Sequence, residues 1–299
     1  MKIEQNIMTF NMGTSTTDNY YIDLARCLSA VNGKSISQTK RSDGKYKPLG
    51  FMIRVRALGD PTGGAGAILL QSLNCGYPTR NAVVLAGAAR DAMLKSAGVS
   101  RGNLESYQKE LRLGFDCTME DSTSLAPGAT SFGFGPDYKN ATTHTNSYGN
   151  QNLYDYTSIV FDDPDNAGTD VKQKLVVLGG APAGSIANEK CAPVVYNWHA
   201  WRHSFTPSDA ADDIADNVFS YAMQQSSTAD SIIDVVEDEA DEKPYALSDF
   251  TTKTVPDLIS TSVGNPVTTV FCAPLGLLKI GQTAANQAFQ IEVLGVTEL

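Results

Sequence analysis

The sequence predicts an all-β protein with a few helices, arranged in two halves, residues 1–150 and 151–299. Short segments with alternating apolar and polar residues recur along the chain, separated by turns rich in Gly, Pro, Asn and Asp, as is typical of β-sandwiches. Each half contains one principal helical stripe, over residues 79–97 and 206–225. A long turn-rich passage, residues 120–151, marks the expected boundary between the halves.

In the first half, alternation predicts strands at residues 3–10 and 51–58. The second of these strands has apolar residues on one face and two arginines on the other. Residues 20–31 fit either a strand or a helix. A short helix is expected at residues 104–113, followed by a strand at residues 115–119.

The principal helix of the first half is predicted to begin with Thr79 as its N-cap and to stop at Gly98. The glycine-rich loop before it, residues 59–67, lacks the Gly-Lys-Ser/Thr ending that a phosphate-binding P-loop requires. We therefore interpret this loop as a connection between strands.

In the second half, the helix is predicted to start with Thr206 as its N-cap and Pro207 at its first position. Residues 206–242 contain eleven acidic residues and no Lys or Arg, while the net charge of the whole chain is −10. We expect its apolar stripe to pack on a sheet and its acidic side to face water or a neighbouring subunit. Further strands are expected at residues 154–161, 171–178, 193–198, 232–236, 245–254, 267–273, 275–280 and 288–296.

Composition narrows the possible classes of protein. With 42% hydrophobic and 19% charged residues, the chain is globular and poor in charge, as chains that bury surface in an assembly often are. Its five cysteines are scattered singly, which indicates free thiols in a reducing compartment. No apolar stretch predicts a secretion signal or a membrane span. A pI near 4.8 argues against a surface that binds nucleic acid as a whole.

Several residues suggest a metal site. Asp162, Asp163 and Asp165 lie in one loop, but an EF-hand template that begins at Asp163 has Ala167 and Lys174 at positions that need ligands. An Asp-rich turn is the simpler interpretation, and an irregular calcium site near these three aspartates is the alternative.

Two histidines, His199 and His203, have the spacing of a helical zinc pair, but Ala200 replaces the glutamate of H-E-x-x-H. We interpret both as structural. The adjacent Trp198 and Trp201 are expected in the core or in an interface.

A basic cluster contains Lys40, Arg41, Lys45 and Lys47 around Tyr46. Such a cluster suits contact with nucleic acid or anionic lipid headgroups, although a solvated turn is the simpler interpretation. Neither G-x-S-x-G nor a cysteine with a plausible histidine partner is recognisable. No catalytic, cofactor-binding or metal residue is therefore assigned.

Two strand-rich halves of about 150 residues, each with its main helix late among the strands, resemble the double jelly-roll major capsid proteins of icosahedral, membrane-containing bacteriophages. The helices at residues 79–97 and 206–225 correspond to the helix that this family has between the sixth and seventh strands of each jelly roll. The resemblance covers nearly the whole chain and rests on the order and length of its segments. It implies two β-sandwich jelly rolls in tandem, residues 1–150 and 151–299.

The resemblance further implies a structural protein, not an enzyme, which self-assembles as pseudo-hexagonal homotrimeric capsomers into an icosahedral viral shell. Its partners would be neighbouring capsomers, penton or other minor virion proteins and, through basic or N-terminal segments, an internal lipid membrane. No cofactor and no small-molecule substrate are expected. The protein would be made in the host cytoplasm and located in the virion.

Two alternatives belong to other classes. A carbohydrate-binding or carbohydrate-cleaving β-sandwich protein also uses jelly rolls, Trp and Asp-rich loops, but the lack of paired disulfides and of a signal peptide counts against it. A cupin-like metal enzyme would need clustered histidines, which three dispersed histidines hardly supply.

Overall fold

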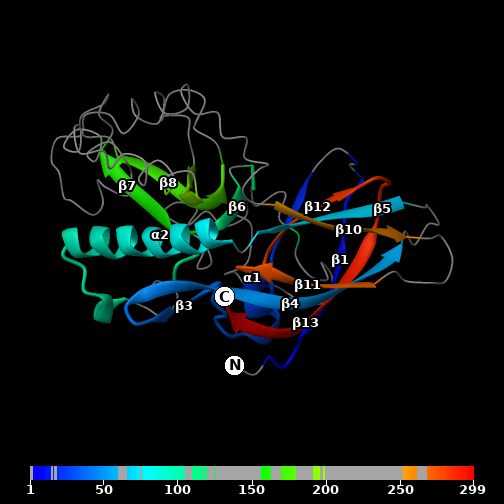
Figure 1. Ribbon diagram of the computed structural model, residues 1–299, viewed down its shortest axis with the longest axis horizontal. Coiled ribbons are helices and arrows are strands. Elements are labelled where there is room, and N and C mark those ends of the chain that lie inside the picture. The colour runs from blue at the N-terminus through cyan, green and yellow to red at the C-terminus, as the bar shows by residue number, and fades with distance from the viewer. Residues whose placement is uncertain are drawn as a thin grey trace.

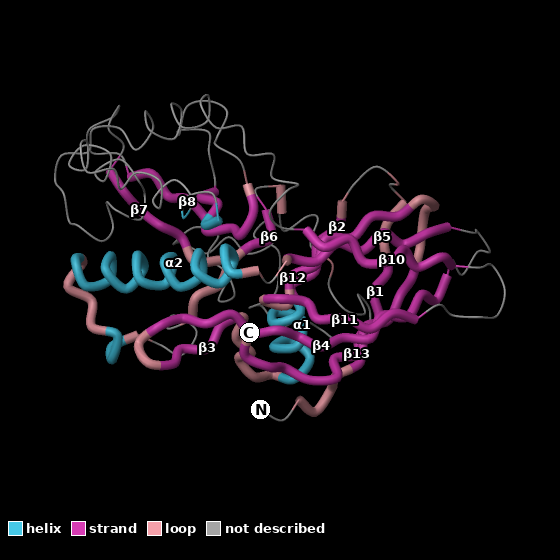
Figure 2. Tube along the Cα trace, viewed as in Figure 1, coloured by secondary structure: helices cyan, strands magenta, loops and turns pink. Residues whose placement is uncertain are grey.

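The computed structural model describes residues 3–14, 16, 19–59, 66–74, 76–104, 110–116, 118–119, 125, 156–162, 170–179, 191–195, 198, 252–260 and 268–299. These residues are mostly in β-strands with few helices, which confirms the all-β prediction (Figure 2). The helices are α1 (Leu24–Asn32), α2 (Tyr77–Ser96) and the 3-10 turn η1 (Arg101–Asn103). The strands are β1 (Ile7–Asn11), β2 (Tyr20–Asp23), β3 (Thr39–Ser42), β4 (Lys45–Gly59), β5 (Gly66–Leu73), β6 (Gly114–Asp116), β7 (Ser158–Asp162), β8 (Asp170–Leu178), β9 (Cys191–Pro193), β10 (Thr252–Ser260), β11 (Thr268–Pro274), β12 (Leu277–Gln282) and β13 (Ala288–Glu298).

Strands from the two ends of the chain form a two-sheet sandwich (Figure 1). One sheet has the order β1-β13-β4-β11, with β3 added to β4, and the other has the order β10-β5-β12-β2. Four antiparallel pairs are nested: β1 with β13, β2 with β12, β4 with β11, and β5 with β10. This is the pairing of a jelly roll, in which a long antiparallel ribbon is rolled until its strands divide between two facing sheets.

This pairing departs from the predicted arrangement of one jelly roll in residues 1–150 and another in residues 151–299. The eight strands of the nested pairs are four from residues 7–73 and four from residues 252–298, and they alternate within each sheet. The sequence pattern determines which face of a strand is buried, but it does not determine which strand lies beside it. The expected boundary at residue 150 therefore does not divide this sandwich.

The core of the jelly roll consists of alternate side chains from both sheets. In β4, Phe51, Ile53 and Val55 are fully buried, while Arg54 between Ile53 and Val55 is exposed. This alternation confirms the predicted strand at residues 51–58. Phe10 of β1 stacks on Phe289 of β13 with 5.4 Å between ring centroids. This contact joins the first and last strands of the chain inside the core.

The ambiguous segment at residues 20–31 contains both a strand and a helix. Strand β2 ends at Asp23, and α1 starts at the next residue. Asp23 is its N-cap, because Oδ1 accepts a hydrogen bond of 3.0 Å from the N–H of Arg26. Leu24 and Leu28 of α1 are buried in the jelly-roll core, so the helix covers one end of the sandwich.

Helix α2 starts two residues before the predicted N-cap, at Tyr77 after Gly76. The prediction of Thr79 as the cap is wrong, because its hydroxyl donates to the carbonyl oxygen of Asn74 at 2.8 Å and holds the preceding turn instead. The predicted stop is confirmed: Gly98 follows the helix with φ of 69°, a conformation that favours glycine.

A third sheet is built from the middle of the chain. β8 pairs with β6 and β9 in parallel and with β7 in antiparallel orientation, unlike the antiparallel jelly-roll pairs. Helix α2 contacts both β8 and β4, so it lies between this sheet and the jelly roll (Figure 1). A second apolar core fills the space, and its buried members include Val83, Ala86, Phe115, Leu175 and Val177.

Two further predictions can be compared with the described residues. The helix expected at residues 104–113 is wrong for residues 110–113, which run without helical structure toward β6 and bury Leu111 and Leu113 in the second core. The strand expected at residues 193–198 is wrong for residues 194 and 195, because β9 ends at Pro193. The predicted helix at 206–225 and the predicted strand at 232–236 lie outside the described residues.

Candidate functional site

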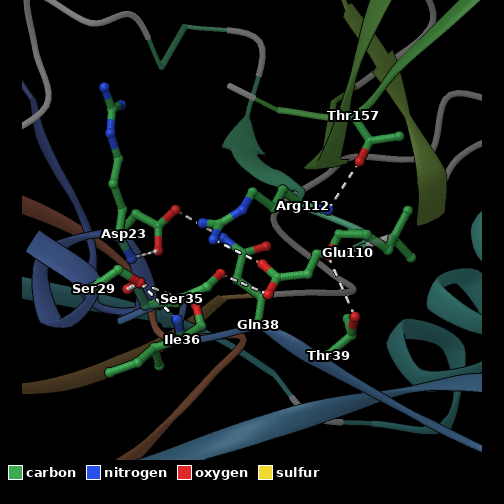
Figure 3. Close-up of polar contacts among 12 residues, drawn as sticks. Asp23, Ser29, Ser35, Ile36, Gln38, Thr39, Glu110, Arg112 and Thr157 are labelled. Carbon is green, nitrogen blue, oxygen red and sulfur yellow. Dashed lines mark hydrogen bonds and ion pairs between the residues drawn. The ribbon is translucent and has the colours of Figure 1, made fainter. Parts of the chain in front are cut away.

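A buried polar network connects the jelly roll to the segment that precedes the third sheet (Figure 3). Its central side chains are Asp23 at the end of β2, Gln38 before β3, and Arg112 before β6, and each is 3% exposed or less. Buried polar side chains are stable only when they are hydrogen-bonded, so this network requires a defined set of partners.

The side-chain amide of Gln38 makes the central contact. Its Oε1 accepts a hydrogen bond of 2.7 Å from the N–H of Leu113, and its Nε2 donates to the carbonyl oxygen of Leu113 at 3.1 Å. The same Nε2 donates to Oδ2 of Asp23 at 2.9 Å. Because Asp23 also caps α1, these few side chains bind together α1, the start of β3 and the entry to β6.

Both the side chain and the backbone of Arg112 make hydrogen bonds. Its Nη2 donates to Oε2 of Glu110 at 2.8 Å, and Oε1 of Glu110 accepts a hydrogen bond of 2.7 Å from the hydroxyl of Ser35. Its N–H donates to Oγ1 of Thr157 at 2.9 Å, and its carbonyl oxygen accepts the N–H of Thr157 at the same distance. A buried guanidinium needs such compensation, because removing its charge from water is costly.

The electrostatics of the network centre on Asp23. Burial raises the pKa of its carboxyl above the ordinary value, although the charge of Arg112 and the hydrogen bonds from Arg26 and Gln38 act in the opposite direction. The network therefore holds a carboxyl whose ionisation is disfavoured by its surroundings. The hydrogen bonds of the network hold the third sheet in place on the jelly roll.

A second polar contact joins the same two parts of the molecule. Oδ2 of Asp116 in β6 accepts hydrogen bonds of 3.0 Å from both Nζ of Lys279 and the hydroxyl of Tyr21. Its Oδ1 accepts the N–H and the hydroxyl of Thr118 at 3.0 and 2.8 Å. Burial raises the pKa of Tyr21, so its hydroxyl remains a donor at neutral pH. Strands β2 and β12 of the jelly roll are thereby linked to β6.

The basic cluster forms a hairpin between β3 and β4. Its turn, Asp43 and Gly44, has φ values of 54° and 76°, as a two-residue hairpin turn of this hand requires. Nζ of Lys40 and Nζ of Lys47 lie 3.2 and 2.6 Å from the carboxylate of Glu298 in β13. Two cations of the cluster are thus paired with one carboxylate of the same chain.

The remaining part of the cluster faces α2. Nη2 of Arg41 lies 2.9 Å from Oδ2 of Asp91, and the hydroxyl of Tyr46 donates to Oδ1 of the same residue at 3.2 Å. Tyr46 is only 2% exposed, so its ring is a core residue and not a stacking surface. Lys45 is exposed at the turn. The cluster therefore offers less free positive charge than its sequence suggests.

The N-terminal segment, expected as a candidate for contact with a membrane, contributes β1 to the jelly roll. Met8 and Phe10 are buried in its core. Among the described helices, none combines the length and apolar character needed to cross a membrane.

The calcium prediction falls largely outside the described residues. The backbone of Asp162 ends β7 opposite Asp170 in β8, while Asp163 and Asp165 are not described. Within the described part of the chain, no three or more His, Cys, Asp or Glu side chains gather as a metal site would require.

Of the tryptophans and histidines considered in the sequence around residue 200, Trp198 is among the described residues. Trp198 is 5% exposed and makes an edge-on contact with Tyr77 at 5.4 Å between ring centroids, which confirms its place in the core. Trp201, His199 and His203 lie outside the described residues.

No family model, curated protein or solved structure matches this chain. The functional argument therefore depends on the fold and on the contacts described above. Of the network residues, only Asp23 had a recognisable signal, an aspartate directly before the apolar residues of a helix. Gln38 and Arg112 are isolated polar residues, and no local pattern distinguishes them from exposed ones.

Proposed function

We propose that the protein is a structural, non-catalytic major capsid protein that self-assembles as homotrimeric capsomers into an icosahedral viral shell. The observation that carries this proposal is the nested pairing of β1, β2, β4 and β5 with β13, β12, β11 and β10. Jelly rolls of this kind are used by viral shell proteins, lectins and cupins.

The contacts around the jelly roll favour the shell protein among these classes. A shell subunit must keep its parts in a fixed relation so that its interfaces repeat, and the Asp23–Gln38–Arg112 network ties the jelly roll to the third sheet through buried hydrogen bonds. A lectin would use exposed aromatic rings. Among the described aromatic residues, Trp198 and Tyr46 are buried, while Tyr77 is 51% exposed and packs edge-on against Trp198. These features support a rigid building unit.

The finer parts of the proposal concern geometry and partners. In a pseudo-hexagonal trimer, the jelly roll and the body formed by α2 and the third sheet would alternate around the three-fold axis. Partners would be further copies of the chain, penton or other minor virion proteins and, through Lys45 at the exposed hairpin turn, an internal lipid membrane. The protein would be made in the host cytoplasm and be part of the virion.

The proposal is tested by purifying the full chain and measuring its mass by sedimentation and light scattering over a range of salt and protein concentrations. We expect a trimer that associates further, and electron micrographs of closed or curved shells with six-sided capsomers. A chain that stays monomeric under all conditions would refute the proposal. Specific binding to a glycan array by such a monomer would favour the carbohydrate-binding class instead.

A further inference from the structure

Among the described strands, none pairs with the last part of β13 on the side away from β4, and we call this side its open edge. β13 pairs with β4 from Ala288 to Glu298, but β1 pairs only with residues 288–292. The N–H of Val293 still donates to the carbonyl oxygen of Asn6 at 2.8 Å. Beyond this bond, no described strand lies beside residues 294–298 on the side away from β4.

A specific contact keeps the backbone groups of Glu4 and Gln5 from pairing with β13. Oδ1 of Asn32, at the end of α1, accepts the N–H groups of Glu4 and Gln5 at 3.0 and 2.9 Å. Its Nδ2 donates to the carbonyl oxygen of Gln5 at 3.0 Å. The amide of Asn32 thus satisfies backbone groups that could otherwise continue the pairing of β1 with β13, and the edge stays open.

The direction of the backbone groups follows from the ladder with β4. The N–H of Leu299 donates to the carbonyl oxygen of Pro48 at 3.1 Å, and Thr297 lies opposite Gly50. Because backbone groups alternate in direction along a strand, those of Val296 and Glu298 point away from β4. They form a short row of donors and acceptors that a further strand could use.

A groove of about 730 Å³ lies at this end of β13, and residues 293–298 line it together with Ile3, Asn6, Leu49 and residues of the 35–41 segment. Leu294 is 45% exposed at its rim. A Cβ atom placed on Gly295 would meet nothing within 4 Å, so the face of the sheet at this residue is open. The groove has room for the backbone and side chains of an extended segment.

The charges beside the groove favour an acidic occupant. Lys40 and Lys47 share the single carboxylate of Glu298, which leaves one positive charge in excess. The chain itself carries 33 acidic and 23 basic residues, and residues 226–242, which follow the helix predicted at 206–225, contain seven of the acidic ones without a Lys or Arg. A second copy of the chain can therefore supply an acidic segment.

We propose that the open edge of β13 takes up an extended acidic segment of a second copy of this chain as an added β-strand. This inference rests on the proposed self-assembly and names the surface that carries it. Added strands gain affinity from backbone hydrogen bonds, so the contact depends on the N–H groups of Val296 and Glu298 and on access past Leu294.

Two variants test the edge. Val296→Pro removes one outward N–H while leaving the ladder bonds of its neighbours, since proline is tolerated at a strand edge. Leu294→Glu places a negative charge at the rim, where it would repel an acidic occupant and block pairing, as charged residues on natural edge strands do. The matched control is Leu58→Glu, since Leu58 lies in β4 of the same sheet, is 47% exposed and does not line the groove.

Association of the purified full-length proteins is measured by sedimentation, and amide hydrogen exchange is compared below and above the association concentration. We expect both edge variants to weaken association about tenfold or more, the control to change it less than about twofold, and the amides of Val296 and Glu298 to gain protection in the associated wild type. Higher salt should weaken association of the wild type.

The inference is overturned if Leu294→Glu associates as tightly as the wild type, or if the control weakens association equally. It is also overturned if the amides of Val296 and Glu298 exchange equally fast in monomer and assembly. These results would leave self-assembly intact and assign it to another surface. A wild type that never associates overturns both this inference and the proposed function.

Discussion

The carboxylate of Asp23 and the side-chain amide of Gln38 meet in a buried hydrogen bond of 2.9 Å at the point where the jelly roll joins the third sheet. The same amide binds both backbone groups of Leu113. Removing it would leave three buried polar groups without this partner, so this side chain is a central part of the joint between the two parts of the molecule.

Gln38→Leu should therefore lower the free energy of unfolding by about 3 kcal/mol, because each buried group that loses its hydrogen bond costs about 1–3 kcal/mol. Urea titration followed by circular dichroism measures the loss. The control is Gln290→Leu on the outer face of the jelly roll, which should change the free energy of unfolding by less than about 0.5 kcal/mol. Equal stability of the two variants would contradict the role of Gln38.

The raised pKa of Asp23 predicts a dependence of stability on pH. The folded protein binds the proton of this carboxyl more tightly than the unfolded chain does. Its stabilising contribution is therefore complete below the unfolded pKa and is lost as pH rises through the higher folded pKa. Asp23→Asn does not titrate, so its stability relative to the wild type should increase as pH rises through this window. Urea titrations at a series of pH values test this, and parallel curves would contradict it.

Much of the fold could be predicted from the sequence, because the burial pattern of a strand is local. The alternation around Ile53 identified β4. The partners of this strand, β11 and β13, lie more than two hundred residues further along, and any strand with a matching apolar face would satisfy the same pattern. For this reason the strands were predictable while their pairing into one jelly roll was not.

The candidate site was predictable to a smaller extent. Asp23 stands where an N-cap is expected. The residues before it form strand β2 and those after it form α1, so the pattern of the whole segment fitted a strand as well as a helix. Gln38 and Arg112 are buried only because residues distant in the sequence pack against them. The positive charges of the basic cluster are evident from the sequence. Their partners Glu298 and Asp91 are not, because these residues are distant in the chain and meet the cluster only in the folded protein.

Gly87 provides a test of how α2 packs on the jelly roll. A methyl group at Gly87 would overlap the ring of Tyr46, a residue of β4 that is buried against α2. In an exposed helix, Gly→Ala would stabilise by about 1 kcal/mol, but overpacking costs about 1–3 kcal/mol. We expect Gly87→Ala to lower the melting temperature. Ala88→Gly, at an exposed position of the same helix, should cost about 1 kcal/mol through propensity alone. A melting temperature raised by Gly87→Ala would show that α2 does not press on Tyr46.

The hairpin turn between β3 and β4 predicts opposite effects at two adjacent positions. Gly44 has a φ of 76°, which costs a residue with a Cβ about 1–2 kcal/mol, so Gly44→Ala should destabilise the protein by about that amount. Asp43 already adopts a φ of 54°, and Asp43→Gly should leave stability unchanged or raise it. Thermal unfolding of both variants measures the difference, and equal melting temperatures would argue against this turn.

The nested pairing of strands predicts that neither half of the chain folds alone. In a fragment of residues 1–150, β4 lacks β11 and β13, and β5 lacks β10 and β12, so its strands cannot bury their apolar faces. We expect each fragment, 1–150 and 151–299, to show no cooperative unfolding transition in circular dichroism. Mixing or co-expressing the fragments should restore it, because the strand pairs form between them. A cooperative transition in the isolated 1–150 fragment would instead favour the tandem arrangement predicted from the sequence.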